Sequence, residues 1–546
     1  MKKILGAAIG TCVHIGGLSH FLKLAEAEGF SATLLGPAIS IERIVNAIRQ
    51  QRPDIMALSY RLTPEVAGNL FRELEQALRE NNLHDTKLIF GGTPPVAALA
   101  KESGIFDRVF DGSEPVGEIR SFLSGTLRIV WKINDTHDLI GRINQKYPYP
   151  ILRHHFGRPT IEETIEGIRE IALSGVLDVI SIGPDQNAQE HFFRPEGMEP
   201  NQTGAGGVPV RTNKDMEALY EASRCGNFPL MRCYAGTKDL LKWGKMSVKT
   251  IHNAWAAIPL CWYSVLDGRS NRNLEEAIAE NQSVMKWYAL QNIPVEVNES
   301  HQWSLRDAHD SLAVAMAFLA AYNAKKMGVR NYVAQFMFNT PPGTMPTMDI
   351  AKMAAKLELI SELEDETFTV YREVHAGIAH FSSQPAIAKG QLATSALISL
   401  ALKPHILHVV GYSEGDHATL PGELIESCRI VHRVLQDCKE GLPDMLSDLK
   451  IITRKGQLVH EAKMLLESFK FLGDNSDDPM SDPFVIARAI REGIIDTPHF
   501  KGNHLLCGEI ITGLINGAWY AIDPSTGEPI DEESRVMRIF NQSKIL

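Results

Sequence analysis

A histidine on a glycine-rich turn is the first side chain of this sequence whose setting could support chemistry. His14 stands in GTCVHIGG, after the apolar run ILGAAIG and before the helical pattern LSHFLKLAEAEG. It could simply be a solvated turn residue. Alternatively, a short loop that follows a strand can hold an imidazole away from the protein, where a ring nitrogen is able to ligate a large group.

Two further loops place small residues where a ligand could pass close to the backbone. Ser59 lies in LSYRL, and Gly91 and Gly92 end the run IFGG. Each follows an apolar stretch typical of a buried strand, and parallel strands carry their carboxyl ends to one edge of a sheet. Glycine leaves room at such an edge because it has no side chain. The three loops therefore predict a single binding edge.

The segments around these loops predict a doubly wound α/β domain over residues 1–125. Short apolar runs alternate there with amphipathic helical patterns, which is the rhythm of parallel β–α–β units. The predicted strands are KKILGAAIG, SATLLG, DIMALSY, TKLIFGG and FDRVFDG. Such a sheet binds ligands beyond the carboxyl ends of its strands, where the strand order reverses.

A second β–α series begins at residue 151 and predicts a (β/α)8 TIM barrel. It holds nine candidate strands, one more than the barrel requires: ILRHHFG, VLDVISIG, VPVRT, FPLMRCYAG, IPLCWYS, IPVEVNES, NYVAQFMFN, TFTVYREVH and ILHVVGY. Polar and ring-bearing side chains gather at the predicted carboxyl ends of these strands, which form the catalytic face of such barrels. They are Arg153, His154, Arg232, Tyr263, Glu299, His301, Asn339, His375 and Tyr412.

Length and composition fit this organisation. The 546 residues exceed one ordinary core, and we divide them into residues 1–125, a connector over 126–150, a barrel over 151–480 and a C-terminal extension over 481–546 that packs on the barrel. The net charge of −11 argues against a nucleic-acid partner. The longest apolar runs are too short for a membrane span. The scattered cysteines lack a CxxC pair and favour a reducing cytoplasm.

The first domain resembles the cobalamin-binding domain of vitamin B12-dependent mutases and methionine synthase. That family carries Asp-x-His-x-x-Gly, then Ser-x-Leu, then Gly-Gly. The matching positions here are Cys12, His14, Gly17, Ser59, Arg61, Gly91 and Gly92. The resemblance implies a flavodoxin-like sheet on which His14 ligates the cobalt and the nucleotide tail of the cofactor runs beside the strands. Cys12 replaces the family's aspartate, which orients the histidine, and Arg61 replaces its leucine.

The second domain resembles the barrel subunit of glutamate mutase, also called methylaspartate mutase. The segment LRHHFGRPTIEETIEGIREIALSGVLDVI places Arg153, and FPLMRCYAGTKDLL places Arg232, on arginines of the family. In HVVGYSEGDHATLPGE, Asp416 falls near the glutamate that contacts the adenosyl ribose, and Glu414 is the competing position. The family's second-strand arginine has no counterpart. The resemblance therefore implies a small carboxylate substrate other than glutamate.

Further candidates for reading the substrate are Tyr263, Glu299 and His301 at the predicted strand ends. The arginines and histidines of this region also have purely structural interpretations. Arg153 and Arg232 could pair with acids inside the barrel, and His154, His155, His375 and His380 could be core or rim residues.

These observations lead to an adenosylcobalamin-dependent carbon-skeleton mutase, a radical isomerase with both parts in one chain, which we expect to be a homodimer. One alternative is a corrinoid methyltransferase that uses methylcobalamin and is related to methionine synthase. Another is a cobalamin-binding protein without catalytic activity.

Overall fold

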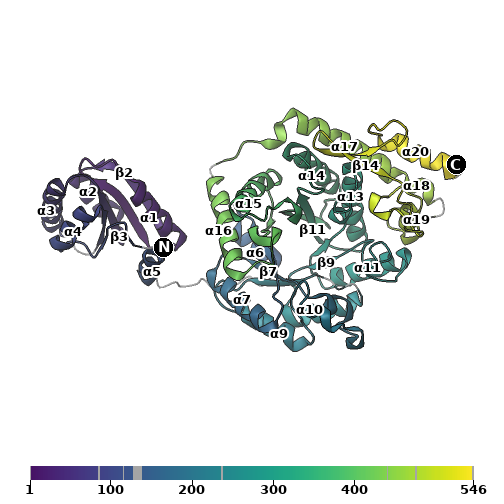
Figure 1. Ribbon diagram of the computed structural model, residues 1–546, viewed down its shortest axis with the longest axis horizontal. Helices are drawn as coiled ribbons and strands as arrows, with labels where there is room; N and C mark the ends of the chain where they lie inside the picture. Colours follow the sequence, from purple (N-terminus) through teal and green to yellow (C-terminus); the bar gives the residue numbers. More distant parts are fainter. Residues whose placement is uncertain are drawn as a thin grey trace. The chain divides into compact units, whose positions relative to one another are not determined.

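The computed structural model describes residues 2–83, 86–114, 116–126, 138–234, 236, 238–439, 441–473 and 476–543. The chain divides into two compact units, Met1–Trp131 and Lys132–Leu546, which are called here the first unit and the barrel unit (Figure 1). Among the described residues, no helix combines the length and the apolar character needed to cross a membrane.

The first unit is a five-stranded parallel sheet in the order β2-β1-β3-β4-β5. This order is flavodoxin-like, and it reverses between β1 and β3, which confirms the predicted doubly wound class. The strands are β1 (Lys3–Ile9), β2 (Ser31–Ile39), β3 (Ile55–Tyr60), β4 (Lys87–Gly92) and β5 (Arg108–Phe110).

Helices cover both faces of this sheet because each carries one apolar stripe. The helices are α1 (Gly16–Ala27), α2 (Ile41–Gln51), α3 (Pro64–Glu80), α4 (Pro94–Ser103) and α5 (Val116–Thr126). Side chains of α1 and α5 share one apolar cluster with the sheet, and those of α2, α3 and α4 share the other. Helix α2 begins at Ser40, whose hydroxyl accepts a hydrogen bond from Arg43 N at 3.3 Å.

The barrel unit contains eight parallel strands in the order β8-β7-β6-β13-β12-β11-β10-β9. Pairing of β13 with β6 continues the order, and β8 and β9 stand at its two ends, so the barrel is nearly closed. Its strands are β6 (Ile151–Phe156), β7 (Val179–Ile182), β8 (Leu230–Cys233), β9 (Ala256–Ile258), β10 (Val295–Val297), β11 (Asn331–Phe338), β12 (Thr369–Ala376) and β13 (Ile406–His408).

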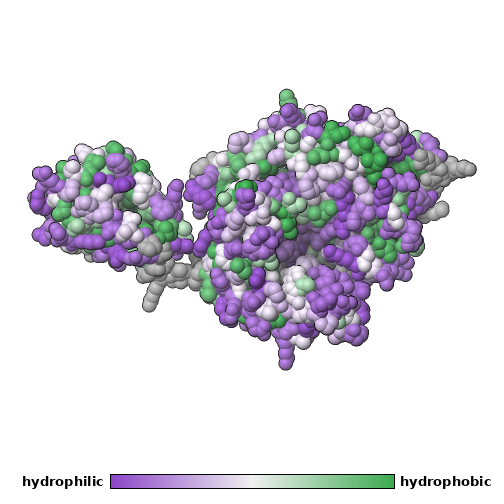
Figure 2. Space-filling view, in the orientation of Figure 1, coloured by the Kyte–Doolittle hydropathy of each residue, from purple (hydrophilic) through white to green (hydrophobic). Residues whose placement is uncertain are grey.

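A ring of helices surrounds these strands, and Figure 2 shows the barrel hollowed at its centre with hydrophilic residues around the hollow. The helices are α7 (Ile161–Ser174), α8 (Gln186–His191), α9 (Asn213–Ala222), α10 (Leu240–Ile251), α11 (Leu274–Leu290), α12 (Ser300–Ser304), α13 (Asp310–Lys326), α14 (Pro346–Ser361), α15 (Pro385–Ser399) and α16 (Pro421–Asp437).

The segment after the barrel is ordered into further elements that pack on it. They are α17 (Leu449–Glu467), α18 (Phe469–Leu472), α19 (Pro483–Arg491), the hairpin of β14 (Ile511–Ile515) and β15 (Ala518–Ile522), and α20 (Glu532–Ser543). Buried residues of α19 and α20, including Ile486, Ile490 and Phe540, belong to the same apolar cluster as α13 and α14.

The prediction of nine strands was wrong at VPVRT. Val208 makes only an isolated bridge to Pro184, and Val208 N donates to Gly183 O at 2.8 Å. The segment is thus a loop that folds back over the end of β7, where its two valines are buried although they form no ladder. IPLCWYS is also mostly loop, because β9 ends at Ile258.

The predicted connector over 126–150 also differs from the structure. Residues 127–137 lie outside the described residues, but α6 (Leu139–Lys146) follows them and belongs to the barrel unit. Leu139 and Ile143 are buried in one apolar cluster with Ile151 and Trp255. Helix α6 therefore covers apolar residues of the barrel strands, and the sequence pattern missed it because a helix this short has weak periodicity.

We predict that Leu139→Ala destabilises the barrel unit, because Leu139 is fully buried in that cluster. Removing a buried leucine side chain typically costs about 2–5 kcal/mol. Denaturant unfolding followed by circular dichroism measures this loss, with Asn144→Ala on the exposed side of α6 as the control. Equal stability of the two variants would contradict the assignment of α6 to the barrel.

Candidate functional site

The first unit contains a cavity of about 560 Å³ at the carboxyl ends of β1, β3 and β4. Six of the seven cobalamin-site residues expected from the sequence line it: His14, Gly17, Ser59, Arg61, Gly91 and Gly92. The seventh, Cys12, is fully buried behind the loop. The loops after three separate strands thus meet at the point where the strand order reverses.

His14 is exposed on its loop, and its orientation is tied to the buried thiol beside it. Cys12 Sγ lies 3.9 Å from His14 Nδ1, so the thiol takes the position of an orienting partner. The other ring nitrogen, Nε2, is then the atom that would coordinate a metal. Val13 and Leu62, on the same loop and on the loop after β3, expose 62% and 39% of their surfaces. Exposed apolar side chains of this size next to a potential ligand suit a broad, partly apolar group.

Ser59 and the glycine pair shape the cavity in different ways. Ser59 is buried, and its hydroxyl has no hydrogen-bond partner in the described part of the chain. A Cβ atom on Gly91 would meet open space, whereas one on Gly92 would lie 2.8 Å from the Phe90 ring and 2.9 Å from Tyr60 O. Gly91 therefore leaves room in the cavity, and Gly92 is required by the packing of the strand itself.

These features fit the cofactor that the sequence implies. The cavity runs along the sheet edge, it contains a buried hydroxyl that needs a partner, and its wall is free of a side chain at Gly91. A nucleotide tail requires such an unobstructed space and a hydrogen-bond partner within it. The exposed imidazole of His14 stands at its mouth.

The barrel unit has a second cavity, of about 390 Å³, among the loops at the carboxyl ends of its strands. Of the sequence-derived candidates, Arg232, Tyr263, His301 and Glu414 line this cavity, and Arg153, Glu299 and Asp416 do not. His375, expected at this face, and His155, considered as a core or rim residue, also line the cavity. The sequence analysis did not single out several other lining residues, among them Tyr234, Asn298, Gln335 and His408. Their positions at strand ends were the available signal.

Two buried arginine–glutamate pairs cross the interior of the barrel. Arg153 on β6 donates from Nε to Glu373 on β12 at 2.5 Å. Arg232 on β8 pairs with Glu296 on β10 at 2.6 Å. The two arginines lie on either side of β7, and each has an Nη1 atom 3.5 Å from Ser181 Oγ.

The structure shows the alternative in which both arginines pair with acids inside the barrel. Arg153 is fully buried, its charge is compensated by Glu373, and it does not reach the cavity. Arg232 also has an internal counter-ion, but it lines the cavity, and its Nε has no hydrogen-bond partner among the described residues. Of these two buried arginines, only Arg232 is therefore placed to contact a bound anion; the partly exposed Arg269 also lines the cavity and lies 3.8 Å from Asp267.

Four histidines gather around the cavity as neutral imidazoles. The ring of His408 lies 5.1 Å from that of His155 and 4.9 Å from that of His375, and His301 lies 6.4 Å from His375. Burial lowers the pKa of His301 and of His375 to about 3, and it also holds the pKa values of His155 and His408 well below the usual range. At neutral pH these rings can donate or accept hydrogen bonds without carrying charge.

Glu299 has a different position from the one expected of a catalytic group. Its carboxylate is fully buried and accepts hydrogen bonds from Leu260 N at 2.8 Å, Cys261 N at 3.0 Å and Trp303 Nε1 at 2.8 Å. Burial raises its pKa despite these donors. Glu299 thus ties the loop after β9 to helix α12, and it supports the cavity wall from behind.

Of the two acidic candidates after β13, Glu414 faces the barrel cavity and Asp416 faces solvent. Glu414 lines the cavity and accepts a hydrogen bond from Gly411 N at 2.6 Å. Burial raises the pKa of Glu414 to about 7. Asp416 is exposed and lies 2.9 Å from His417 Nδ1, so the competing position is the one that the cavity favours.

The fold and these two cavities define a class of protein: a doubly wound cofactor-binding unit joined to a parallel β/α barrel. Residues 2–119 match the family model of the B12 binding domain. The first unit is therefore a B12-binding domain, and its cofactor is a cobalamin.

Solved structures give weaker likenesses. A cobalamin-binding protein from Desulfitobacterium hafniense DCB-2 is 29% identical, with a TM-score of 0.20. The match spans 22% of this chain and 57% of the length of that protein. A truncated 3-deoxy-D-arabino-heptulosonate 7-phosphate synthase from Thermotoga maritima is 12% identical over 53% of this chain and 88% of its own, with a TM-score of 0.32. The cobalamin-dependent S-adenosylmethionine radical enzyme OxsB is 10% identical over 87% of this chain and 69% of its own, with a TM-score of 0.17. At these TM-scores, none of the three carries a conclusion about this chain.

We predict that Gly91→Leu keeps the fold but weakens cobalamin binding by at least about tenfold, because the new side chain would occupy the open groove. Gly92→Ala should instead lower the thermal unfolding midpoint, since its Cβ would clash with Phe90 and Tyr60. Titration with hydroxocobalamin, followed by visible absorption, measures the first effect. Unchanged affinity in Gly91→Leu would place the tail elsewhere.

We also predict a pH-dependent effect of Glu414. A carboxyl whose folded pKa is raised from 4.5 to about 7 stabilises the fold below the unfolded value, and this contribution is lost as the pH rises through 7. Glu414→Gln imitates the protonated form, so its stability relative to the native chain should increase across that window by up to about 3 kcal/mol. Denaturant unfolding at several pH values measures the difference. A difference that does not change with pH would contradict the raised pKa.

Proposed function

We propose that this protein is an adenosylcobalamin-dependent carbon-skeleton mutase that acts on a small carboxylate. The observation that carries the proposal is the presence, in one chain, of a B12-binding domain and a barrel with a polar cavity at the carboxyl ends of its strands. When bound, adenosylcobalamin would supply homolytic cobalt–carbon chemistry, which ordinary side chains cannot provide. The remaining work belongs to the residues of the chain.

In the first unit, His14 would bind the cobalt and Cys12 would orient the imidazole. The thiol is a weaker hydrogen-bond partner than a carboxylate, and its 3.9 Å separation from Nδ1 is correspondingly long. The hydroxyl of Ser59 would find its missing partner on the nucleotide tail, for which Gly91 leaves space.

In the barrel, Arg232 would bind the substrate carboxylate through the edge of its guanidinium that Glu296 does not use. Arg153 is compensated by Glu373 and does not line the cavity, and Arg269, which does, is partly exposed and lies 3.8 Å from Asp267. Arg232 is therefore the one buried arginine among the described residues of the cavity wall. This favours a substrate with one main carboxylate over a dicarboxylate. Tyr263 and His301 would contact the other end, and the neutral histidines would keep the cavity polar without adding charge.

Glu414 has the properties of a group that could hold a proton or a ribose hydroxyl near the mouth of the cavity. It is 79% covered by its surroundings, since its side chain is 21% exposed, and its pKa of about 7 allows both protonation states near neutral pH. The proposal assigns this role to Glu414 in preference to Asp416.

The proposal is tested by incubating the full chain with adenosylcobalamin and a panel of small carboxylic acids, glutamate and 3-methylaspartate included, and by following isomerisation by proton NMR. We expect turnover of an acid with one main carboxylate. A panel that binds without rearrangement, or methyl transfer from methylcobalamin in its place, would contradict the mutase assignment. Efficient interconversion of glutamate and 3-methylaspartate would contradict the substrate class.

For the acid that is turned over, we predict that Arg232→Lys lowers kcat/KM by about a hundredfold, because a point charge cannot reproduce a planar, two-pronged contact. Steady-state kinetics measure the loss. Arg433→Lys on the surface of α16 is the matched control, since Arg433 pairs with Asp437 outside the cavity. A similar kcat/KM for both variants would show that Arg232 serves only its internal pair with Glu296.

A further inference from the structure

The C-terminal segment makes four contacts with residues 306–310, which are the loop after α12 and the first residue of α13. The hydroxyl of Thr497 donates to Arg306 O, and the hydroxyl of Thr512 donates to Asp307 O at 2.7 Å. Glu532 Oε1 lies 2.7 Å from His309 Nε2. The contacted residues follow closely in the chain after His301 and Gln302, which line the barrel cavity.

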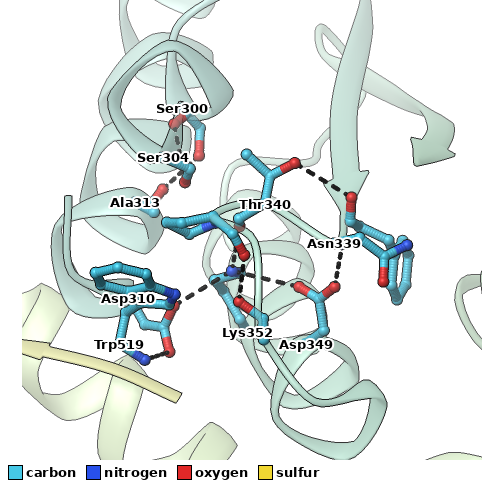
Figure 3. A network of polar contacts seen from close by, with 12 residues as sticks. Ser300, Ser304, Asp310, Ala313, Asn339, Thr340, Asp349, Lys352 and Trp519 are labelled. Carbon is cyan, nitrogen blue, oxygen red and sulfur yellow. Dashed lines mark hydrogen bonds and ion pairs between the residues drawn. The ribbon is translucent and has the colours of Figure 1, made fainter. Parts of the chain in front are cut away.

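The fourth contact falls on Asp310, where several distant elements meet (Figure 3). Its carboxylate accepts a hydrogen bond from Trp519 N on β15 at 3.1 Å and pairs with Lys352 on α14 at 3.2 Å. Arg454 on α17 also lies 3.2 Å from it. Because Asp310 and Lys352 are fully buried and mutually compensated, this junction is costly to break and fixes the first residue of α13.

An aromatic cluster joins the C-terminal segment to helix α12 and to the loop after β9. The ring of Phe500 lies 5.7 Å from Trp303 on α12 and 6.1 Å from Trp262, the neighbour of Tyr263. Trp262 and Trp303 are themselves 4.8 Å apart. Phe500 therefore packs against Trp262 and Trp303, which are close neighbours of Tyr263 and His301 in the chain. Glu299 links the same two segments, the loop after β9 and helix α12.

The loop that holds His301 has little stability of its own. Helix α12 spans only Ser300–Ser304, and a helix this short is not stable without tertiary contacts. The loop after β9 is equally dependent, since Tyr263 has a positive φ of 60°. Both loops must be held by what packs behind them, and the C-terminal segment supplies much of that packing.

We propose that the C-terminal segment, residues 483–543, is a positioning element that sets one wall of the barrel cavity, the wall formed by Tyr263 and His301. This inference rests on the proposed function in so far as the cavity is the substrate site. Thr497, Thr512 and Phe500 touch no substrate in this account, and they act through the loops that they hold.

The test compares the double variant Thr497→Val/Thr512→Val with Thr497→Ser/Thr512→Ser in the full chain. Valine preserves the shape and removes both hydroxyl contacts, whereas serine keeps the hydroxyls. Hydrogen–deuterium exchange with mass spectrometry should show exchange at residues 300–308 about tenfold faster in the valine variant and restored in the serine variant, because a lost hydrogen bond favours local opening. Thr453→Val on the exposed side of α17 is the control, since its hydroxyl bonds within its own helix.

A role in general packing would produce a different result. Faster exchange spread over α7 and α13, or no change at residues 300–308, would overturn the proposal. For the acid found in the panel above, the valine variant should lose about tenfold in kcat/KM and the serine variant should recover it. Selective loosening with unchanged kcat/KM would also overturn the proposal. If the native chain turns over no acid, the proposed function fails, and the exchange measurement alone decides whether the segment holds the wall.

Discussion

The direction of parallel strands is the constraint on which both sites depend. In each unit the strands carry their carboxyl ends to one edge, so residues that are far apart in sequence are brought onto neighbouring loops. His14, Ser59 and Gly91 come together around one cavity in this way, and so do Arg232, His301 and Glu414 in the barrel. The helices between the strands make this direction possible, because a parallel pair needs a crossover connection.

Charge compensation is the second constraint, and it decides what the barrel can bind. Two guanidinium groups are buried within the barrel, and removing the partner of such a group typically costs about 3–5 kcal/mol. Glu373 and Glu296 supply these partners from β12 and β10, which are next-nearest strands to β6 and β8 around the barrel. The histidines nearby remain neutral for the same reason, since burial and the adjacent arginines disfavour their charged forms. The resulting cavity is polar but nearly balanced in charge.

Local patterns were enough to predict the doubly wound sheet and the barrel, and the resemblance to a known family added the cobalamin loops. The meeting of His14, Ser59 and Gly91 at one edge could be predicted because each lies at, or shortly after, the carboxyl end of a parallel strand. The partner of Arg153 could not be predicted in this way, because Glu373 lies 220 residues further along the chain. Glu299 was a substrate-site candidate for a similar reason, because the local sequence NES gives no sign of the three hydrogen-bond donors that its carboxylate binds. VPVRT alternates like a strand, but its backbone bonds to Gly183 as a loop.

We propose that His14 binds the cobalt of cobalamin, and the function of the first unit depends on this bond. Electron paramagnetic resonance of the one-electron-reduced complex tests it most directly, with the protein labelled at its histidines with ¹⁵N. The account predicts that the superhyperfine pattern changes from the triplets of an ordinary nitrogen to the doublets of ¹⁵N, and that His14→Ala abolishes this change while the fold persists. A triplet pattern that is unchanged by the label would show that the cofactor keeps its own base, and it would contradict cobalt binding by His14.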